Sequence, residues 1–183
     1  AEETIRRNLI RRGFIKGIIG LPPNLFFGTG IPACIVVLDK AEAHATARRF
    51  DPAVYMTLRL APDMLALPWQ LRIAADAAKG CAARLSGQEP PVFEDNETTL
   101  DELRQRIRKT LAYLETVKPA ALDGSEERDI VIPARNRDPR RFKGQFYLQH
   151  WVLPNFFFHA TTLYALLRHN GVELGKPDFL GVD

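Results

Sequence analysis

The chain has 183 residues, of which 46% are hydrophobic, so it is long enough to bury one substantial core. Its formal charge of +3 comes from 25 basic and 22 acidic side chains, a balance that does not by itself indicate a polyanionic partner. No apolar run reaches the roughly 18 residues of a transmembrane helix, and the acidic start, Ala1-Glu2-Glu3, is unlike that of a signal peptide. We therefore expect a globular protein of the cytoplasm with no membrane contact.

The first forty residues differ in composition from the rest of the chain. Residues 3–30 suit a short basic helix, a short strand and a loop rich in proline and glycine, in that order. Two alternatives stay open for the next residues. Residues 31–38 could form a β-branched strand, or residues 33–49 could form one helix with Pro32 near its first turn. We favour the helix, because a strand here has no sheet to join while other amphipathic helices leave a face that needs cover.

This part of the chain carries a first resemblance. The run IRRNLIRRGFIKGIIGLPPNLFFGTGIPACIVVLDK, Ile5 to Lys40, resembles the late catalytic-domain segment of the methyltransferase subunit of type I restriction-modification systems, which methylates adenine N6 in DNA. The resemblance implies a glycine-rich S-adenosylmethionine loop and an Asn/Asp-Pro-Pro-Tyr/Phe motif. Neither is present, because Leu21 stands where the amide or carboxylate belongs and no aromatic residue follows Pro22-Pro23 directly. We expect no transfer of a labelled methyl group by this chain alone.

Basic residues gather in two places and could contact phosphates. One group lies in residues 135–143, and the other consists of Arg6, Arg7, Arg11, Arg12 and Lys16. A solvated face is the alternative that we favour, because runs of charge usually mark exposed segments. If these residues do bind DNA, the affinity is expected to fall as salt rises, since binding releases counterions.

Two amphipathic helices follow. Apolar and small side chains at steps of three and four predict a helix over residues 63–85, with Pro62 just ahead of its first turn. Thr99 and Glu102 have the spacing of a capping box and open a second helical pattern that ends near Lys118.

The pattern of the following residues predicts a β-hairpin and then a last helix. Residues 129–132 and 140–143 suit the two strands of the hairpin. Residues 145–168 suit the helix, which should kink or restart at Pro154 and stop at Asn170-Gly171. Its expected core face consists of Phe146, Gln149, Leu153, Phe156, Ala160, Leu163 and Leu167.

A second resemblance covers residues 38–183. The motifs LDKAEAHATARRFDPAVYMTLRLAPDM, GQEPPVFEDNETTLDELRQRI and PNFFFHATTLYALLRHNGVELGKPDFLG resemble those of an uncharacterised bacterial family of unknown function related to the DinB-like four-helix bundles. This implies a mainly α fold, a DinB-like four-helix bundle with a short β-hairpin before the last helix and an irregular N-terminal appendage. We divide the chain into a methyltransferase-like segment, 1–32, and a bundle domain, 33–183. The resemblance implies a fold and no activity.

The histidines decide whether a metal is expected. DinB-like metalloproteins generally hold a divalent metal with three histidines, two of them one turn apart on the last helix. At about 100° per residue, His150, His159 and His169 cannot form such a pair, and His44 is a distant partner at most. His159 is the one metal candidate, and the alternative that we favour is a hydrogen-bonded core histidine. We therefore expect no metal and no other cofactor.

No residues emerge as catalytic or cofactor-binding. Cys34 and Cys81 suit small buried apolar groups. Six polar residues could line a pocket between helices, or could be the polar residues that a bundle normally has at its rim: Asp63, Gln70, Asp76, Thr161, Thr162 and Tyr164.

The sequence leaves several functions open. The one that we favour is a non-catalytic module that binds a ligand or a partner, with a homo-oligomer or another protein as that partner. The alternatives are a module of the DNA methyltransferase system that is inactive alone, a DinB-like metal-dependent enzyme, and a fusion of unrelated segments with no joint function.

Overall fold

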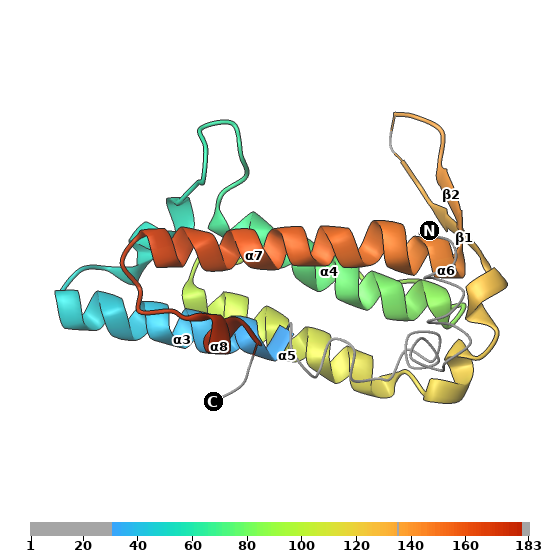
Figure 1. Ribbon diagram of the computed structural model, residues 1–183, viewed down its shortest axis with the longest axis horizontal. Coiled ribbons are helices and arrows are strands. Elements are labelled where there is room, and N and C mark those ends of the chain that lie inside the picture. The colour runs from blue at the N-terminus through green and yellow to red at the C-terminus, as the bar shows by residue number, and fades with distance from the viewer. Residues whose placement is uncertain (1–30, 135, 181–183) are drawn as a thin grey trace, which may run out of the picture.

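The computed structural model describes residues 31–134 and 136–180, and its long helices form a four-helix bundle (Figure 1). The helices are α3 (Ile31–Arg48), α4 (Leu67–Leu85), α5 (Leu100–Thr116) and α7 (Leu153–His169). Helices α3 and α4 each pack against both α5 and α7, so the order around the bundle is α3, α5, α4, α7. The predicted mainly α bundle is confirmed. The elements predicted within residues 3–30, the N-terminal basic group included, lie outside the described residues.

Residues 31–38 are helical, so the strand alternative is wrong. Helix α3 buries one face, made of Ile31, Ala33, Cys34, Val37, Leu38, Ala41 and Ala45. The β-branched residues within it disfavour a helix only slightly, and burial against two neighbouring helices outweighs that preference. Arg104 of α5 also forms ion pairs with Asp39 and Glu42 of α3, which fixes the two helices side by side.

Helix α4 begins four residues later than predicted, at Leu67 instead of Asp63. Ala66 is extended at the N-cap, and Pro68 lies in the first turn. Pro68 has no N–H to donate to the carbonyl of Met64, so a helix that started at Asp63 would lose a bond there. Residues 58–66 instead form an irregular connection after the short 3-10 helix Pro52–Thr57.

Helix α5 begins and ends as predicted. The hydroxyl oxygen of Thr99 accepts a hydrogen bond from the backbone N–H of Glu102 at 3.2 Å, and the Glu102 carboxylate accepts one from the backbone N–H of Thr99 at 3.0 Å. The reciprocal pair satisfies two backbone donors that a helix start leaves open. Two short 3-10 helices, Pro119–Leu122 and Ser125–Glu127, then lead to the hairpin.

The predicted hairpin is present. Strands β1 (Asp129–Ile132) and β2 (Arg140–Lys143) pair antiparallel, with Ile130 opposite Phe142. Ile130 is buried and Phe142 packs partly against the core, so one face of the hairpin covers the end of the bundle.

The last predicted helix is built from three joined pieces. They are the short α6 (Gly144–Phe146), a π-helix over Tyr147–Val152, and α7, with Pro154 in the first turn of α7. The expected restart at Pro154 is confirmed. Phe146 does not lie on the core face as predicted, because its side chain is 53% exposed. The wider π-helical turns rotate this end of the helix, so Tyr147, Leu148 and Val152 are buried instead.

The chain after α7 crosses back over α3 and ends in a short helix that was not predicted, α8 (Lys176–Leu180) (Figure 1). Asp178 accepts a hydrogen bond from the backbone N–H of Gly175 at 2.7 Å and pairs with Lys40 of α3 at 2.7 Å. Within the described ranges no helix is both long and apolar enough to cross a membrane.

Candidate functional site

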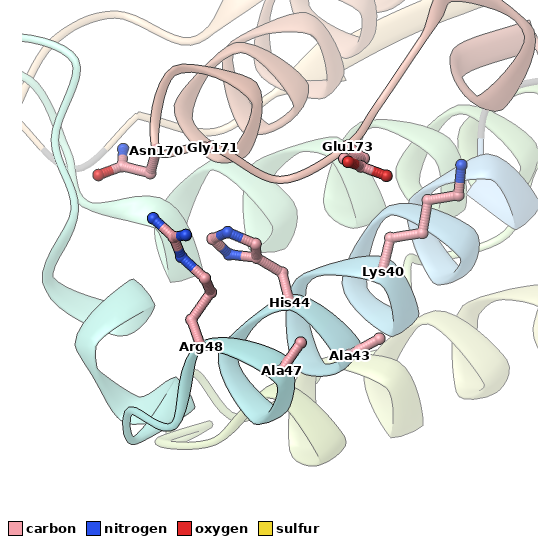
Figure 2. Close-up of a pocket in the computed structure, with 8 residues that line it drawn as sticks. All are labelled: Lys40, Ala43, His44, Ala47, Arg48, Asn170, Gly171 and Glu173. Carbon is pink, nitrogen blue, oxygen red and sulfur yellow. The ribbon is translucent and has the colours of Figure 1, made fainter.

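A cleft of about 610 Å³ lies where α3 and α7 both end. One wall is the last three turns of α3, and the other is the connection that leaves α7. Figure 2 shows three long side chains rising from α3 toward that connection. The described residues around the cleft are Lys40, Ala43, His44, Ala47, Arg48, Asn170, Gly171 and Glu173.

Helical spacing explains why α3 presents these residues together. Lys40, His44 and Arg48 are four residues apart and therefore share one face of the helix. Ala43 and Ala47 lie between them, and their short side chains leave the space above the helix open. The face of α3 that is buried in the bundle core lies next to this one, so His44 is partly covered.

The imidazole of His44 is held from one side. Its Nδ1 is 2.7 Å from the hydroxyl of Tyr55, a buried residue of the 3-10 helix that follows α3. Phe50 packs edge-on against both rings, with centroids 5.7 Å from His44 and 5.5 Å from Tyr55. Burial raises the pKa of Tyr55, so its phenol stays protonated at neutral pH. The hydrogen bond with Tyr55 and the contact with Phe50 fix the orientation of the His44 ring, and its other nitrogen, Nε2, faces the cleft.

Gly171 forms the part of the far wall that faces this nitrogen. Its φ of 89° is a conformation that residues with a side chain rarely adopt. A Cβ at this position would lie 3.5 Å from Nε2 of His44. A side chain would therefore fit beside the imidazole in ordinary contact, and glycine is required here only by the backbone conformation that ends α7. The last carbonyls of α7 are capped by backbone N–H groups of residues 170–172 and do not open toward the cleft.

The charges along the cleft are not equally neutralised. Lys40 pairs with Asp178, and this ion pair, followed by the hydrogen bond from Gly175, lowers the pKa of the Asp178 carboxyl. Within the described residues Arg48 has no ion pair, and neither has Glu173. The end of the cleft near Arg48 and His44 therefore carries the positive charge of Arg48, while Glu173 lies nearer Lys40 (Figure 2).

His159, the predicted metal candidate, lies elsewhere. It is a half-buried residue of α7 whose Nδ1 is 2.8 Å from Oε1 of Gln70 on α4. Gln70 is buried, and its amide nitrogen donates to the carbonyl of Leu65 at 2.7 Å, which fixes Oε1 as the acceptor. Nδ1 of His159 therefore donates. Burial lowers the pKa of His159, so the ring is neutral at pH 7 and joins α4 to α7.

The residues do not fit the metal that DinB-like proteins generally hold. In residues 31–134 and 136–180, no three side chains among histidine, cysteine, aspartate and glutamate come together as a metal-binding group. His44 and His159 each use Nδ1 in a hydrogen bond to a different partner. One free imidazole nitrogen at each place is not a site for a divalent ion, which needs several ligands.

We expect a chelator to leave the melting temperature of the protein unchanged. His159→Ala is the matched variant, and its melting temperature should be equally insensitive to EDTA, because no bound metal stabilises the folded state. Thermal denaturation followed by circular dichroism is the measurement. An EDTA-induced drop in the parent alone would show that His159 is a metal ligand after all.

The six predicted pocket residues do not gather in one place. Gln70 meets His159, whereas Asp76 forms ion pairs with Lys79 and Arg106 at 2.8 and 2.9 Å. Asp63 and Thr161 are exposed. The hydroxyls of Thr162 and Tyr164 donate to backbone carbonyls, at 2.7 and 3.4 Å. The structure does not bring these residues together in one pocket, and the alternative of polar residues at the rim of the bundle fits their separate positions.

Both cysteines are buried, as predicted. Burial raises the pKa of Cys34 and of Cys81 to about 12, so neither forms a thiolate at neutral pH.

The site that the structure shows was missed at the sequence level. The sequence presents His44 only as a distant metal partner, and no pattern in it marks Tyr55. The i, i+4, i+8 spacing of Lys40, His44 and Arg48 was a signal in the sequence. Its meaning depended on residues 31–48 being one helix.

Comparisons with known proteins agree with this architecture. The family model described as Domain of unknown function (DUF1993) matches residues 26–180. A crystal structure of a DinB family member protein from Shewanella denitrificans has a TM-score of 0.82 and 38% sequence identity, with 93% of this chain and 95% of that chain covered.

The fold and this match define the class of protein, a DinB-like four-helix bundle with a hairpin before its last helix. Within that class, the chain belongs to the family Domain of unknown function (DUF1993). Neither match supports the methyltransferase resemblance of residues 5–40, and the family match begins inside that run, at residue 26. The methyltransferase alternative and the division after residue 32 stay predictions from the sequence.

Proposed function

We propose that this chain is a non-catalytic binding module, and that the cleft between α3 and the connection after α7 takes a small ligand with an anionic group. The observation that carries the proposal is His44. Its ring is held by Tyr55 through Nδ1, at 2.7 Å, while its other nitrogen faces an open cleft. A histidine fixed in this way is pre-organised to bind, since little side-chain freedom is lost when the ligand arrives.

The charges favour an anion at one end of the cleft. Arg48 has no ion pair among the described residues, and a guanidinium can hold a carboxylate or phosphate through two hydrogen bonds. Asn170 lies at the same end of the cleft (Figure 2), and its amide nitrogen donates to the Leu166 carbonyl at 2.7 Å. Glu173, at the other end, would repel a second anionic group, so we propose a ligand with one such group and a neutral or basic remainder.

A binding role is favoured over catalysis by the side chains around the cleft. The described residues that line it include no serine, threonine or cysteine that His44 could activate as a nucleophile. From the sequence we further propose a cytoplasmic location and no cofactor. We also propose that the partner is a second copy of this chain or another protein.

Inorganic phosphate is the probe that tests the cleft. In two-dimensional NMR of the imidazole rings, added phosphate should shift the His44 signal saturably, and His44→Gln assigns that signal by its loss. Arg48→Gln should weaken binding about tenfold or more, because one charge-assisted hydrogen bond contributes roughly 1.5–3 kcal/mol.

Arg108→Gln is the matched control, since Arg108 is an exposed arginine of α5, outside the cleft. It should leave phosphate affinity unchanged. Equal losses in the two variants, or equal shifts of all the histidine signals, would indicate general charge attraction and overturn the proposal. An unshifted His44 signal would overturn it as well.

A further inference from the structure

A second, smaller cavity lies at the start of α7, whereas the cleft lies at its end. It has a volume of about 220 Å³, below the roughly 300–1,000 Å³ of pockets for drug-sized ligands, so an occupant must be small. Helix α4 forms one wall, and the π-helical turn with the start of α7 forms the other. The residues that line it are Ile73, Asp76, Ala77, Arg84, Ile132, Tyr147, Trp151, Val152 and Asn155.

Arg84 is the cationic group of this cavity and has no acidic partner among the described residues. Its Nη1 donates to the hydroxyl of Tyr147 at 3.1 Å, and no ion pair joins it to any described carboxylate. The side chain is only partly exposed. Half-buried arginines are normally paired, because removing a charge from water costs free energy.

Gly80 makes room for this guanidinium. It lies inside α4, one turn before Arg84, where glycine is a poor helix former. A Cβ at residue 80 would lie 2.5 Å from Nη1 of Arg84, which is too close for both to stay. The missing side chain lets the guanidinium fold back along α4 and reach Tyr147.

Tyr147 contributes a second donor. Its side chain is 2% exposed, and burial raises its pKa to about 12, so the phenol keeps its proton at neutral pH. The hydroxyl oxygen accepts from Arg84, and its own proton has no acceptor in the described part of the chain. The Tyr147 hydroxyl can therefore donate a hydrogen bond to an acceptor atom of a ligand, which would satisfy this buried polar group.

The π-helical turn brings the rest of the wall into place. Tyr147, Trp151 and Asn155 follow at steps of four, and Nδ2 of Asn155 donates to the Trp151 carbonyl at 2.6 Å. π-Helical turns are rare and often found at functional sites. Asp76 also faces the cavity, but Oδ1 of its carboxylate is held by Lys79 and Arg106, which offset its charge. The remaining lining is apolar.

We propose that this cavity binds a small monocarboxylate with an apolar body. The carboxylate accepts hydrogen bonds from the guanidinium of Arg84 and from the hydroxyl of Tyr147. The apolar body packs against Trp151 and the aliphatic side chains. The site is separate from the cleft at His44 and does not depend on it.

Tryptophan fluorescence tests the proposal with 3-methylbutanoate as probe. In a Trp69→Phe background, Trp151 is the one tryptophan left, because the chain has two. The carboxylate should change its emission saturably. The neutral amide, 3-methylbutanamide, and the cation, 3-methylbutylamine, should bind about tenfold more weakly or not at all, since they cannot replace a charge-assisted hydrogen bond.

Two variants distinguish a loss of carboxylate binding from a loss of protein stability. Arg84→Gln should weaken the carboxylate about tenfold for the same reason. Gly80→Ala should weaken it too by displacing the guanidinium, while its melting temperature should not fall, because alanine is the better helix former. Gly80→Ala decides the question if Arg84→Gln does not fold. Arg48→Gln, in the other cleft, should bind the carboxylate like the parent.

Three results would overturn the proposal. They are equal binding of the three probes, no saturable change with 3-methylbutanoate, and unchanged carboxylate affinity in Gly80→Ala. None of them bears on phosphate binding at His44.

Discussion

Phe156→Ala is expected to lower the free energy of unfolding by about 3–5 kcal/mol, the largest effect of any substitution considered for this chain. Phe156 is 1% exposed and lies on the face of α7 that packs against the core. Truncation removes the buried ring and leaves a cavity that the surrounding helices can close only in part. Because a single domain has roughly 5–15 kcal/mol of stability in total, the variant should be close to unfolding.

Urea denaturation followed by circular dichroism gives the loss directly, as a lower midpoint at unchanged slope. Phe158→Ala is the matched control, with the same atoms removed two residues along the same helix. Phe158 is 56% exposed, so its truncation removes little buried surface and should cost clearly less. Similar losses in the two variants would contradict the assignment of Phe156 to the core and Phe158 to the surface.

Arg106→Met is expected to lower the free energy of unfolding by about 3 kcal/mol. The Arg106 side chain is 1% exposed and holds the connection after α4 against α5. Its Nη1 pairs with Glu97 at 2.8 Å, and its Nη2 pairs with Asp76 at 2.9 Å and with Asp95 at 3.0 Å. The substitution keeps most of the side-chain volume but leaves carboxylates without their shared cation. The loss should lie at the lower end of the range for buried pairs, because Asp76 and Asp95 are partly exposed and keep some hydration.

Arg108→Met serves as the control for Arg106→Met. Arg108 lies two residues further along α5 and is exposed, so its loss should change stability by less than about 0.5 kcal/mol. If Arg106→Met were equally harmless, the ion-pair network would not stabilise the fold.

The same network predicts how stability depends on pH. Burial by itself would raise the pKa of Glu97, but hydrogen bonds from Arg106, from its own backbone and from Arg72 outweigh burial and lower it. A carboxyl with a lowered folded-state pKa stabilises the protein above its ordinary value, near 4.5, and that contribution is lost as the pH falls through the folded-state pKa. Glu97→Gln should therefore flatten the acid limb of stability measured against pH. An unchanged acid limb would contradict this role.

The local sequence pattern was enough to predict much of the secondary structure of the bundle. The Thr99 and Glu102 pair, the three-four periodicity of α5 and the β-branched first strand of the hairpin each depend on residues close in sequence, and each was found where predicted. The start of a helix was predicted less accurately where a proline interrupts the apolar periodicity, as in α4. The apolar spacing continues back to Met64, but Pro68 removes the bond that would have joined that residue to α4.

The face of a helix can be predicted only while its turns are regular. From Phe156 to Leu167 the predicted core positions are buried. Before Pro154 the wider π-helical turns shift the buried side to Tyr147, Leu148 and Val152, and nothing in the apolar spacing signals that change.

The sequence by itself determined that the chain folds as helices, where the hairpin lies and that no local motif marks a catalytic centre, because these depend on neighbouring residues. The tertiary structure settled the two alternatives for residues 31–38 in favour of the expected helix, since burial against α5 and α7 overrides a weak strand preference. It also decided which distant residues meet. His44 faces Gly171 only because α3 and α7 end at the same side of the bundle, and Arg84 reaches Tyr147 only because α4 packs against the π-helical turn. Contacts between residues so far apart in sequence follow from packing, which no local pattern specifies.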